Sequence, residues 1–409
     1  MRRILFVDDE PMVLDGLRRT LRTMGKEWQM EYATSGREAL EILAARVFDV
    51  LVTDMRMPGM DGCQLLNHVR ELYPHTVRII LSGQSDKEEL LKSIEPVHLY
   101  LSKPCDAEIL KATLARTFAV RHLLENDSLA EVISKIQSLP SLPSLYYEII
   151  DEIRSADGSL ARVGDIISKD LGMSAKILQL VNSSFFGLAT HISSPAKAVS
   201  LLGLETIKAL VLGIKIFSGF SSSDLPCYSI ATLWDHSLAT ACLAREIARH
   251  LNLTQDEIED SFLAGLLHDI GKLILLDRLP EACGKIAEVA SSTECPVSQA
   301  EKKVLGTTHG RIGAYLLGIW GFSESVVNAV AFHHCPGECP NDALSALTAV
   351  YLANQCQGKN DPGNINKTVN FDLDYLSKSG IDRIEELLLT CSDPCRLGEN
   401  GGCEDSFRR

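Results

Sequence analysis

Three carboxylates stand where short apolar runs end in the amino-terminal part of the chain. Asp8 and Asp9 follow one such run, and Asp54 ends another that is rich in β-favouring residues. The Met-Pro-Gly after Asp54 would stop a strand, so Asp54 is expected at a strand's carboxyl end. Ligands of open α/β sheets bind beyond those ends, so these carboxylates predict a ligand site.

Ser82 and Lys103 follow two further apolar runs and extend the same pattern. If the strands lie side by side, three carboxylates, a hydroxyl and an ammonium converge on one edge of the sheet. Carboxylates suit Mg²⁺, which needs one or two of them together with phosphate oxygens. An ammonium and a hydroxyl can bind the oxygens of a phosphorylated Asp. The residue types therefore predict phosphoryl chemistry at Asp54.

Alternating strand and helix patterns predict the framework that positions these residues. We expect a doubly wound, five-stranded parallel sheet with a flavodoxin-like α/β fold. Its strands are predicted near 3–7, 28–33, 48–53, 77–81 and 97–101, and its helices at 11–24, 36–46, 62–72, 86–94 and 106–124.

The stretch 1–124 resembles the receiver domain of two-component response regulators. The resemblance implies that a sensor histidine kinase phosphorylates Asp54, that the Arg56 carbonyl assists Mg²⁺ binding, and that Lys103-Pro104 is a cis bond. It also implies that Mg²⁺ is bound by Asp8, Asp9 and Asp54. The switch residues that it implies are Ser82, Tyr100 and Lys103.

Helical periodicity takes over after residue 129 and predicts an all-α second half. Helices are expected at 144–154, at 167–187 with a polar end from Asn182, and from Pro195 onward. Further helices are expected at 234–250 and 381–389, with an irregular loop at 361–366 and a disordered tail from 401. The double Leu-Pro at 139–143, the Asn182-Ser183 pair and the Leu-Gly-Leu-Glu at 202–205 resemble the HDOD output domain. The expected division is a helical linker at 125–138, an HDOD domain at 139–355, and a helical extension and tail at 356–409.

Histidines and one aspartate in the second half form the other candidate site. Imidazoles combined with a carboxylate suit divalent transition metals. The pattern resembles the HD superfamily of metal-dependent phosphohydrolases, and Gly271 in its HDIGK motif is a plausible helix stop. The resemblance implies a first metal held by His236, His268 and Asp269, and a second served by His309 with His333 or His334.

Two departures from that superfamily leave the function of the second half open. Asn354 stands where a closing Asp is expected, and no Gly-Tyr-Pro follows His334. An amide is a poorer metal ligand than a carboxylate, and buried histidines can be ordinary core residues. These departures favour a regulatory module that binds an output protein or a second copy of the chain. The alternative is a phosphohydrolase that cleaves a cyclic nucleotide or another phosphodiester.

Composition limits the partners and the compartment. The net charge of −14 disfavours nucleic acid, because duplex binding needs a basic surface. The chain shows no secretion signal and no apolar run long enough to span a membrane, so a cytoplasmic protein without membrane contact is predicted. Four carboxyl-terminal thiols could bind zinc, although unconnected thiols are favoured: Cys335, Cys339, Cys391 and Cys395.

Overall fold

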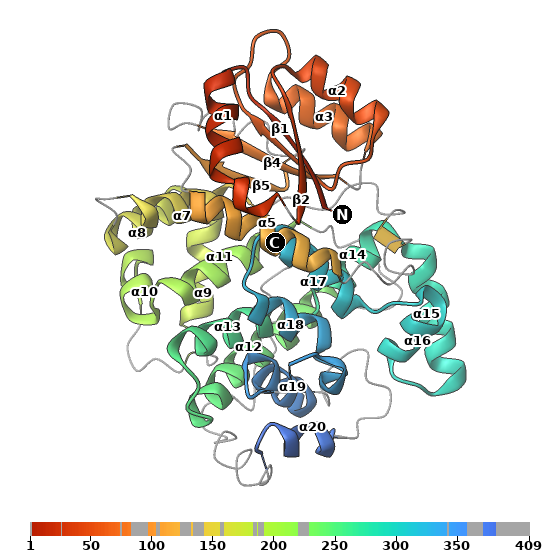
Figure 1. Cartoon of the computed structure of the whole chain (residues 1–409). Coiled ribbons are helices and arrows are strands. Elements are labelled where there is room, and N and C mark those ends of the chain that lie inside the picture. Colours follow the sequence, from red (N-terminus) through yellow and green to blue (C-terminus); the bar gives the residue numbers. More distant parts are fainter. Residues whose placement is uncertain are drawn as a thin grey trace. The chain divides into compact units, whose positions relative to one another are not determined.

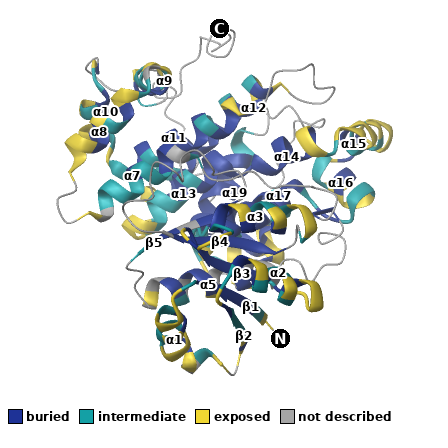
Figure 2. Cartoon of the chain, turned by 90° about the horizontal axis from the view of Figure 1, so that it is seen from above, coloured by how far each residue is buried: buried dark blue, intermediate teal, exposed yellow. Residues whose placement is uncertain are grey.

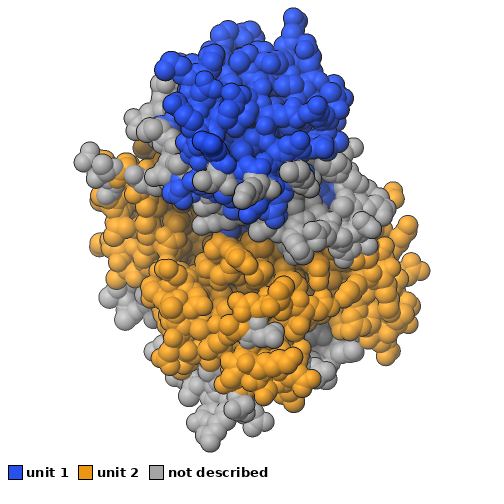
Figure 3. Space-filling view, viewed as in Figure 1, with its two compact units in different colours: residues 1–144, 316–322 blue, residues 145–315, 323–409 orange. Residues whose placement is uncertain are grey.

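The computed structural model divides the chain into two compact units, residues 1–144 with 316–322 and residues 145–315 with 323–409 (Figure 3). The described residues are 2–25, 27–73, 76–82, 97–103, 107–122, 132–133, 143–155, 159–182, 186, 192–219, 229–341, 343–357 and 371–381.

The first unit contains a five-stranded sheet in the order β2-β1-β3-β4-β5, and all four strand pairs are parallel. This confirms the predicted flavodoxin-like sheet. The elements are β1 (Arg2–Val7), α1 (Pro11–Thr20), η1 (Arg22–Met24), β2 (Trp28–Ala33), α2 (Gly36–Ala45), β3 (Val50–Asp54), α3 (Gly62–Leu72), β4 (Val77–Ser82), β5 (Leu99–Ser102) and α5 (Ala107–His122).

Alternation along the strands gives this sheet two buried faces. Leu5 and Leu51 pack in a core cluster with buried side chains of α2 and α3. Phe6 is also fully buried and stacks on Tyr32, with ring centroids 5.5 Å apart. Because successive side chains of a strand point to opposite faces, Phe6 belongs to the face opposite Leu5. Figure 1 shows α1 on one side of the sheet and α2 with α3 on the other.

Some predicted boundaries of the first unit need correction. The helix expected at 11–24 ends at Thr20, and a short 3₁₀ turn follows. The third and fifth strands each begin two residues later than expected, at Val50 and Leu99. The predicted helix 86–94, the linker 125–138 apart from residues 132–133, and Pro104 lie outside the described residues.

The second unit is helical throughout its described residues. Its helices are α7 (Ser144–Arg154), α8 (Leu160–Lys169), α9 (Leu171–Val181), α10 (Pro195–Leu202), α11 (Leu204–Ser218), α12 (Ile230–His250), α13 (Gln255–Leu267), α14 (Ile270–Arg278), α15 (Pro280–Thr293), α16 (Val297–Leu305), α17 (His309–Ile319), α18 (Glu324–Phe332), η4 (Pro336–Glu338), α19 (Ala346–Gln357) and α20 (Leu373–Lys378).

Helices α12, α13 and α19 form the buried centre of this unit (Figure 2). Gly265 of α13 permits their close packing, since a Cβ there would lie 2.7 Å from the Cα of Ala241 in α12. Helices in proteins owe most of their stability to tertiary packing of their apolar faces, and these three are packed against one another. The candidate histidines sit on or beside these helices.

Three predictions about the helices were wrong in detail. The expected helix 167–187 is two helices, because Asp170 stops α8 and caps α9 by accepting a hydrogen bond from the Met173 N–H. The helix expected to open at Trp234 begins at Ile230, which places His236 inside α12. Gly271 does not stop a helix but lies in the first turn of α14.

The remaining predictions for the carboxyl-terminal region fall mostly outside the described residues. These include the loop 361–366, most of the helix at 381–389, the tail from 401, and both Cys391 and Cys395. The short helix α20 was not predicted. In the part of the chain that the structure describes, no helix has the length and apolar character needed to cross a membrane.

Candidate functional site

Three of the predicted receiver residues meet at the carboxyl edge of the sheet. Asp54 is the last residue of β3, Asp8 follows β1, and Lys103 follows β5. The Lys103 Nζ donates to Asp8 Oδ2 at 2.9 Å and forms a close ion pair with Asp54 Oδ1. Asp9 lies half-buried in the turn after β1. The parallel register brings these residues together although 95 positions separate Asp8 from Lys103.

The loop after β3 fixes the carboxylate of Asp54. The backbone N–H of Arg56 donates to Asp54 Oδ2 at 2.9 Å. Gly59 has a φ of 83°, which only glycine adopts readily, and it turns the loop back toward the sheet. A Cβ at Gly62 would lie 2.1 Å from the Asp54 carbonyl oxygen, so the start of α3 can rest against Asp54 only with glycine there.

The charge balance of this edge suits a divalent cation. Burial lowers the pKa of Lys103, but its hydrogen bonds with Asp54 and Asp8 outweigh this and raise that pKa above its ordinary value. The side chain is therefore an ammonium. It is opposed by three carboxylates, Asp8, Asp9 and Asp54, which leaves an excess of negative charge and the oxygen ligands that Mg²⁺ prefers.

The predicted switch residues are placed through the backbone. Ser82 is the last residue of β4, and Tyr100 lies in β5. Strand pairing sets Ile80 opposite Tyr100 and Ser82 opposite Ser102. Both residues therefore belong to the strands that end beside Lys103, while the side chains of Ser82 and Tyr100 lie outside the described atoms.

All six metal-ligand candidates of the helical unit form one buried cluster. His236 comes from α12, His268 and Asp269 from the turn between α13 and α14, His309 from the start of α17, and His333 and His334 from the end of α18. Two groups within it have ligand atoms that all lie within 4.8 Å of one another, namely His236, His268 and Asp269, and Asp269, His309, His333 and His334.

The first group is joined to Asn354. His268 donates from Nδ1 to the Gly265 carbonyl at 2.8 Å, which leaves its Nε2 as an acceptor. His236 Nε2 lies 3.2 Å from that atom and 3.1 Å from Asn354 Oδ1. A hydrogen on His236 Nε2 satisfies both acceptors, so Asn354 occupies the place of the expected Asp and engages a candidate ligand atom.

In the second group, hydrogen bonds at Nδ1 orient the imidazoles of His309 and His333. The Nδ1 of His309 donates to Glu301 Oε2 at 2.7 Å, and the Nδ1 of His333 donates to the Val330 carbonyl at 2.7 Å. When these imidazoles are neutral, both Nε2 atoms carry lone pairs, and these atoms lie 3.3 Å apart. His334 Nε2 lies 3.2 Å from His309 Nε2. Lone pairs at such distances repel unless a cation lies between them.

Asp269 connects the two groups through its two oxygens. Its Oδ2 accepts a hydrogen bond from the buried ammonium of Lys272 at 2.8 Å and lies 3.4 Å from His268 Nε2. Its Oδ1 lies 3.2 Å from His309 Nε2, and it has no hydrogen-bond donor among the described residues unless that imidazole carries a second proton. A buried acceptor without a donor is costly, so Oδ1 also calls for a cation.

Burial and neighbouring charges shift the pKa values of the cluster in different directions. Burial opposes ionisation of Asp269, but His268 and Lys272 hold its pKa well below its ordinary range. Burial and neighbouring imidazoles hold the pKa of His333 and of His334 well below the usual value. Burial also lowers the pKa of His309, but Glu301 and Asp269 raise it to about 9. The carboxylates thus favour positive charge at His309.

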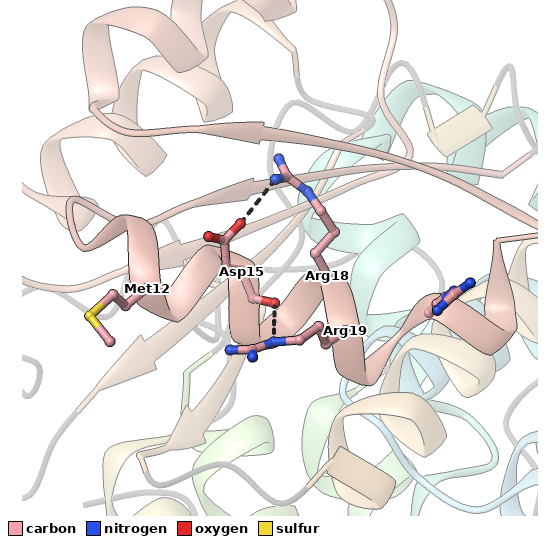
Figure 4. Close-up of a pocket in the computed structure, with 5 residues that line it drawn as sticks. Met12, Asp15, Arg18 and Arg19 are labelled. Atoms are coloured by element: carbon pink, nitrogen blue, oxygen red, sulfur yellow. Dashed lines mark hydrogen bonds and ion pairs between the residues drawn. The ribbon is translucent and has the colours of Figure 1, made fainter.

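A shallow groove on α1 carries no such chemistry. It has a volume of about 540 Å³ and is lined by Met12, Asp15, Arg18, Arg19 and Arg22 (Figure 4). Its charged groups bind one another, since Arg18 pairs with Asp15 at 3.0 Å and Arg19 donates to the Asp15 carbonyl at 3.2 Å.

Family comparisons match both halves of the chain. The response regulator receiver domain matches residues 4–115, and the HDOD domain matches residues 139–336. The chain has a response regulator receiver domain followed by an HDOD domain. This confirms both resemblances and the predicted sequence of an α/β domain followed by an all-α domain.

Relatives of this receiver–HDOD chain agree with the family match. An uncharacterized protein of Treponema pallidum is 28% identical over 225 residues, 55% of this chain and 43% of that protein. The transcriptional regulatory protein ZraR of Escherichia coli O157:H7 is 31% identical over 176 residues, 43% of this chain and 39% of ZraR. The chain thus spans about two fifths of the length of these relatives.

A solved HDOD domain protein of unknown function from Geobacter sulfurreducens shares the helical fold. Its TM-score is 0.54 at 21% sequence identity, over 66% of this chain and 95% of that one. Together with the histidine and aspartate cluster, this fold is compatible with a divalent metal in the HDOD half.

Two residues that contact the candidate metal ligands were missed from the sequence. Lys272 is the last residue of the HDIGK motif, so its distance of three positions from Asp269 on a helix could have predicted the ion pair. Glu301 lies in α16 among charged residues and gives no comparable signal. Only the packing of α16 against the start of α17 reveals that it orients His309.

Proposed function

We propose that this chain is a response regulator of a two-component system. A sensor histidine kinase phosphorylates Asp54 of its receiver domain, and this phosphorylation controls the HDOD half. The observation that carries the proposal is the ion pairing of Lys103 with both Asp8 and Asp54 at the strand ends. The HDOD half acts as a regulatory module that binds an output protein or a second copy of the chain.

The geometry supports phosphoryl transfer to Asp54. A carboxylate oxygen of Asp54 forms a bond to phosphorus, the phosphorus–nitrogen bond of the kinase phosphohistidine breaks, and its electron pair returns to the imidazole. Mg²⁺ held by Asp8, Asp9 and Asp54 would neutralise charge on the phosphoryl oxygens. The Arg56 N–H keeps the Asp54 carboxylate oriented, and the Lys103 ammonium moves from that carboxylate to a phosphoryl oxygen.

Labelling with a small phosphodonor tests the assignment. The full chain incubated with labelled acetyl phosphate and Mg²⁺ should gain one alkali-labile phosphoryl group, because an acyl phosphate hydrolyses in base. Asp54→Asn should abolish the label. Asp61→Asn is the matched control, since Asp61 is a nearby carboxylate that serves as the N-cap of α3. Undiminished labelling of Asp54→Asn would refute the proposal.

A second function, metal-dependent phosphoester hydrolysis, is favoured by the buried cluster around Asp269. Two contacts oppose it: Asn354 engages His236, and Lys272 engages the Asp269 oxygen that faces the first group. In an assay with bis-p-nitrophenyl phosphate and added Mn²⁺, the unmodified chain should hydrolyse the substrate no faster than His268→Ala does. Turnover that depends on His268 would replace the regulatory module by an enzyme.

A further inference from the structure

The Asp269 cluster has a first half, formed by the group His236, His268 and Asp269, and a second half, formed by the group Asp269, His309, His333 and His334. The ligand atoms of these two halves differ in the hydrogen bonds that they already form. In the first half, His236 Nε2 is engaged by Asn354 and by His268, and Asp269 Oδ2 is engaged by Lys272. If the Asn354 amide is rotated by 180°, its N–H donates to His236 Nε2 and uses the lone pair instead. Either orientation withdraws His236 from a metal. Hydrogen bonds therefore close this half.

In the second half, ligand atoms face one another: His309 Nε2 lies close to His333 Nε2, His334 Nε2 and Asp269 Oδ1. The hydrogens of His309 and His333 point away, toward Glu301 and the Val330 carbonyl. Asp269 Oδ1 is buried and, while His309 is neutral, lacks a donor among the described residues. A proton on His309 Nε2 can form a hydrogen bond of good geometry with only one neighbouring acceptor. A metal ion can bind His309, His333, His334 and Asp269 at the same time.

The separations in the second half match a tetrahedral ion. With Zn–N distances of 2.0–2.1 Å, neighbouring ligand atoms should be about 3.3 Å apart. His309 Nε2 lies 3.3 Å from His333 Nε2, 3.2 Å from His334 Nε2 and 3.2 Å from Asp269 Oδ1. Asp269 Oδ1 and His333 Nε2 are farther apart, at 3.9 Å. The His309 ring is tilted by 50° and 87° to those of His333 and His334, so the imidazoles approach from different directions.

Glu301 completes this half as a positioning residue. It accepts both the backbone N–H and the Nδ1–H of His309, and its side chain is buried. Such a carboxylate fixes the tautomer of a ligating histidine and increases its basicity, and its loss usually costs 10–100-fold in metal affinity. In the first half, His268 donates to a backbone carbonyl and not to a carboxylate.

We infer that the HDOD domain binds one divalent ion of the Zn²⁺ class through Asp269 Oδ1, His309, His333 and His334. The first half of the cluster, which contains His236 and His268, stays metal-free. Four protein ligands leave no coordination position for water, which is the arrangement of a structural ion. The ion ties α14, α17 and α18 together. The inference rests on the proposed non-hydrolytic role of this half and is independent of phosphorylation at Asp54.

Metal content of single variants tests which half is occupied. The full chain, saturated with Zn²⁺ and then dialysed, should retain one ion per chain. His334→Gln should remove it, and the partial exposure of His334 makes this change tolerable to the fold. His236→Gln should retain one ion. Loss of the ion in His236→Gln with retention in His334→Gln would place the ion in the first half and overturn the inference.

Cobalt substitution gives a readout that does not depend on activity or on a variant that folds. Co²⁺ in four-coordinate sites absorbs visible light far more intensely than six-coordinate Co²⁺, so the unmodified chain should show the intense spectrum. A weak six-coordinate spectrum, two bound ions, or no bound ion would each overturn the inference. Failure here would leave the acetyl phosphate result, and hence the receiver assignment, unaffected.

Two further variants test the reasons for the asymmetry. Glu301→Gln should weaken Zn²⁺ affinity by about 10–100-fold while leaving the stoichiometry at one. The double variant Lys272→Met with Asn354→Asp should raise the stoichiometry from one to two, because it frees Asp269 Oδ2 and restores a carboxylate beside His236. A stoichiometry that stays at one would contradict the explanation that hydrogen bonds close the first half.

Discussion

The lysines of the two candidate sites, Lys103 and Lys272, bind carboxylates with different freedom to move. Lys103 bridges Asp8 and Asp54, and its side chain is 30% exposed, so it can turn toward an incoming phosphoryl group. Lys272 is 2% exposed and is held on Asp269. Separating an ammonium from a buried carboxylate is costly unless another cation replaces it. Lys272 therefore stays paired with Asp269 and does not act as a switch.

Removing Lys103 should reveal how strongly the receiver carboxylates need a cation. Lys103→Met leaves Asp8 and Asp54 facing each other without their shared ammonium, and the free energy of unfolding should fall by about 1–3 kcal/mol. Excess Mg²⁺ should recover more stability in this variant than in the unmodified chain, because a ligand of the folded state stabilises it by mass action. Urea unfolding with Mg²⁺ and with a chelator measures both effects.

The control for this prediction is Lys111→Met. Lys111 forms a surface pair with Glu108 at 2.8 Å, and exposed pairs of this kind contribute less than about 1 kcal/mol. If both variants lose the same stability, or if Mg²⁺ helps them equally, Lys103 has no special role at the phosphorylation site.

At the scale of elements, glycines decide how closely the helices that carry the metal ligands approach. A Cβ at Gly271 in α14 would lie 1.9 Å from the carbonyl oxygen of His309, the first residue of α17. A Cβ at Gly310 would lie 2.8 Å from the Val330 carbonyl of α18. The approach of α14, α17 and α18 brings Asp269 within 3.2 Å of His309.

Gly271→Ala should therefore separate α14 from α17. Backbone cannot yield as a side chain does, so we expect a loss of about 1–3 kcal/mol or more in the free energy of unfolding, and a weaker Zn²⁺ affinity. Gly284→Ala is the matched control. Gly284 lies inside α15, where an added Cβ would meet nothing within 4 Å, and the change should stabilise the chain by up to about 1 kcal/mol.

Thermal unfolding of these two variants, together with Zn²⁺ titration, checks the prediction. Equal unfolding temperatures for Gly271→Ala and Gly284→Ala would mean that the two helices have room to adjust. In that case the ligand geometry would have to be maintained by the imidazole hydrogen bonds alone.

At the scale of the whole molecule, the proposed function requires that a charge change at Asp54 alters the HDOD half. A ligand or modification shifts a conformational equilibrium only through its different interactions with the two states. The elements available on the chain between the two sites are α5, the linker 125–138 and α7. Ser82 and Tyr100, on the strands beside Lys103, are the expected first movers.

Hydrogen exchange should detect this coupling. With beryllofluoride and Mg²⁺ as a phosphate mimic, we expect exchange of backbone amides to change in α5, between Ala107 and His122, and in the segment that leads into α7 at Ser144. Asp54→Asn should show no change under the same conditions. A response confined to the residues around Asp54 would show that the receiver acts by another route, such as dimerisation.

The sequence alone determined the receiver site because its residues are placed by strand ends. In a parallel sheet every strand ends at the same edge, so Asp8, Asp54 and Lys103 could be brought together from apolar periodicity without knowing any contact. The HDOD ligand candidates were identified by residue type and by the resemblance to the HD superfamily. The stop at Asp170 could also have been found, since an Asp before an apolar run is a typical N-cap.

Only the tertiary structure decided how the HDOD candidates are divided. The contact between His236 and Asn354 joins residues 118 positions apart, and helix periodicity contains no information about which helices meet. The same is true of Glu301, which reaches His309 through the packing of α16 against α17. Hydrogen bonds that engage one set of ligand atoms and leave the other set open depend on atomic positions, which residue types do not determine.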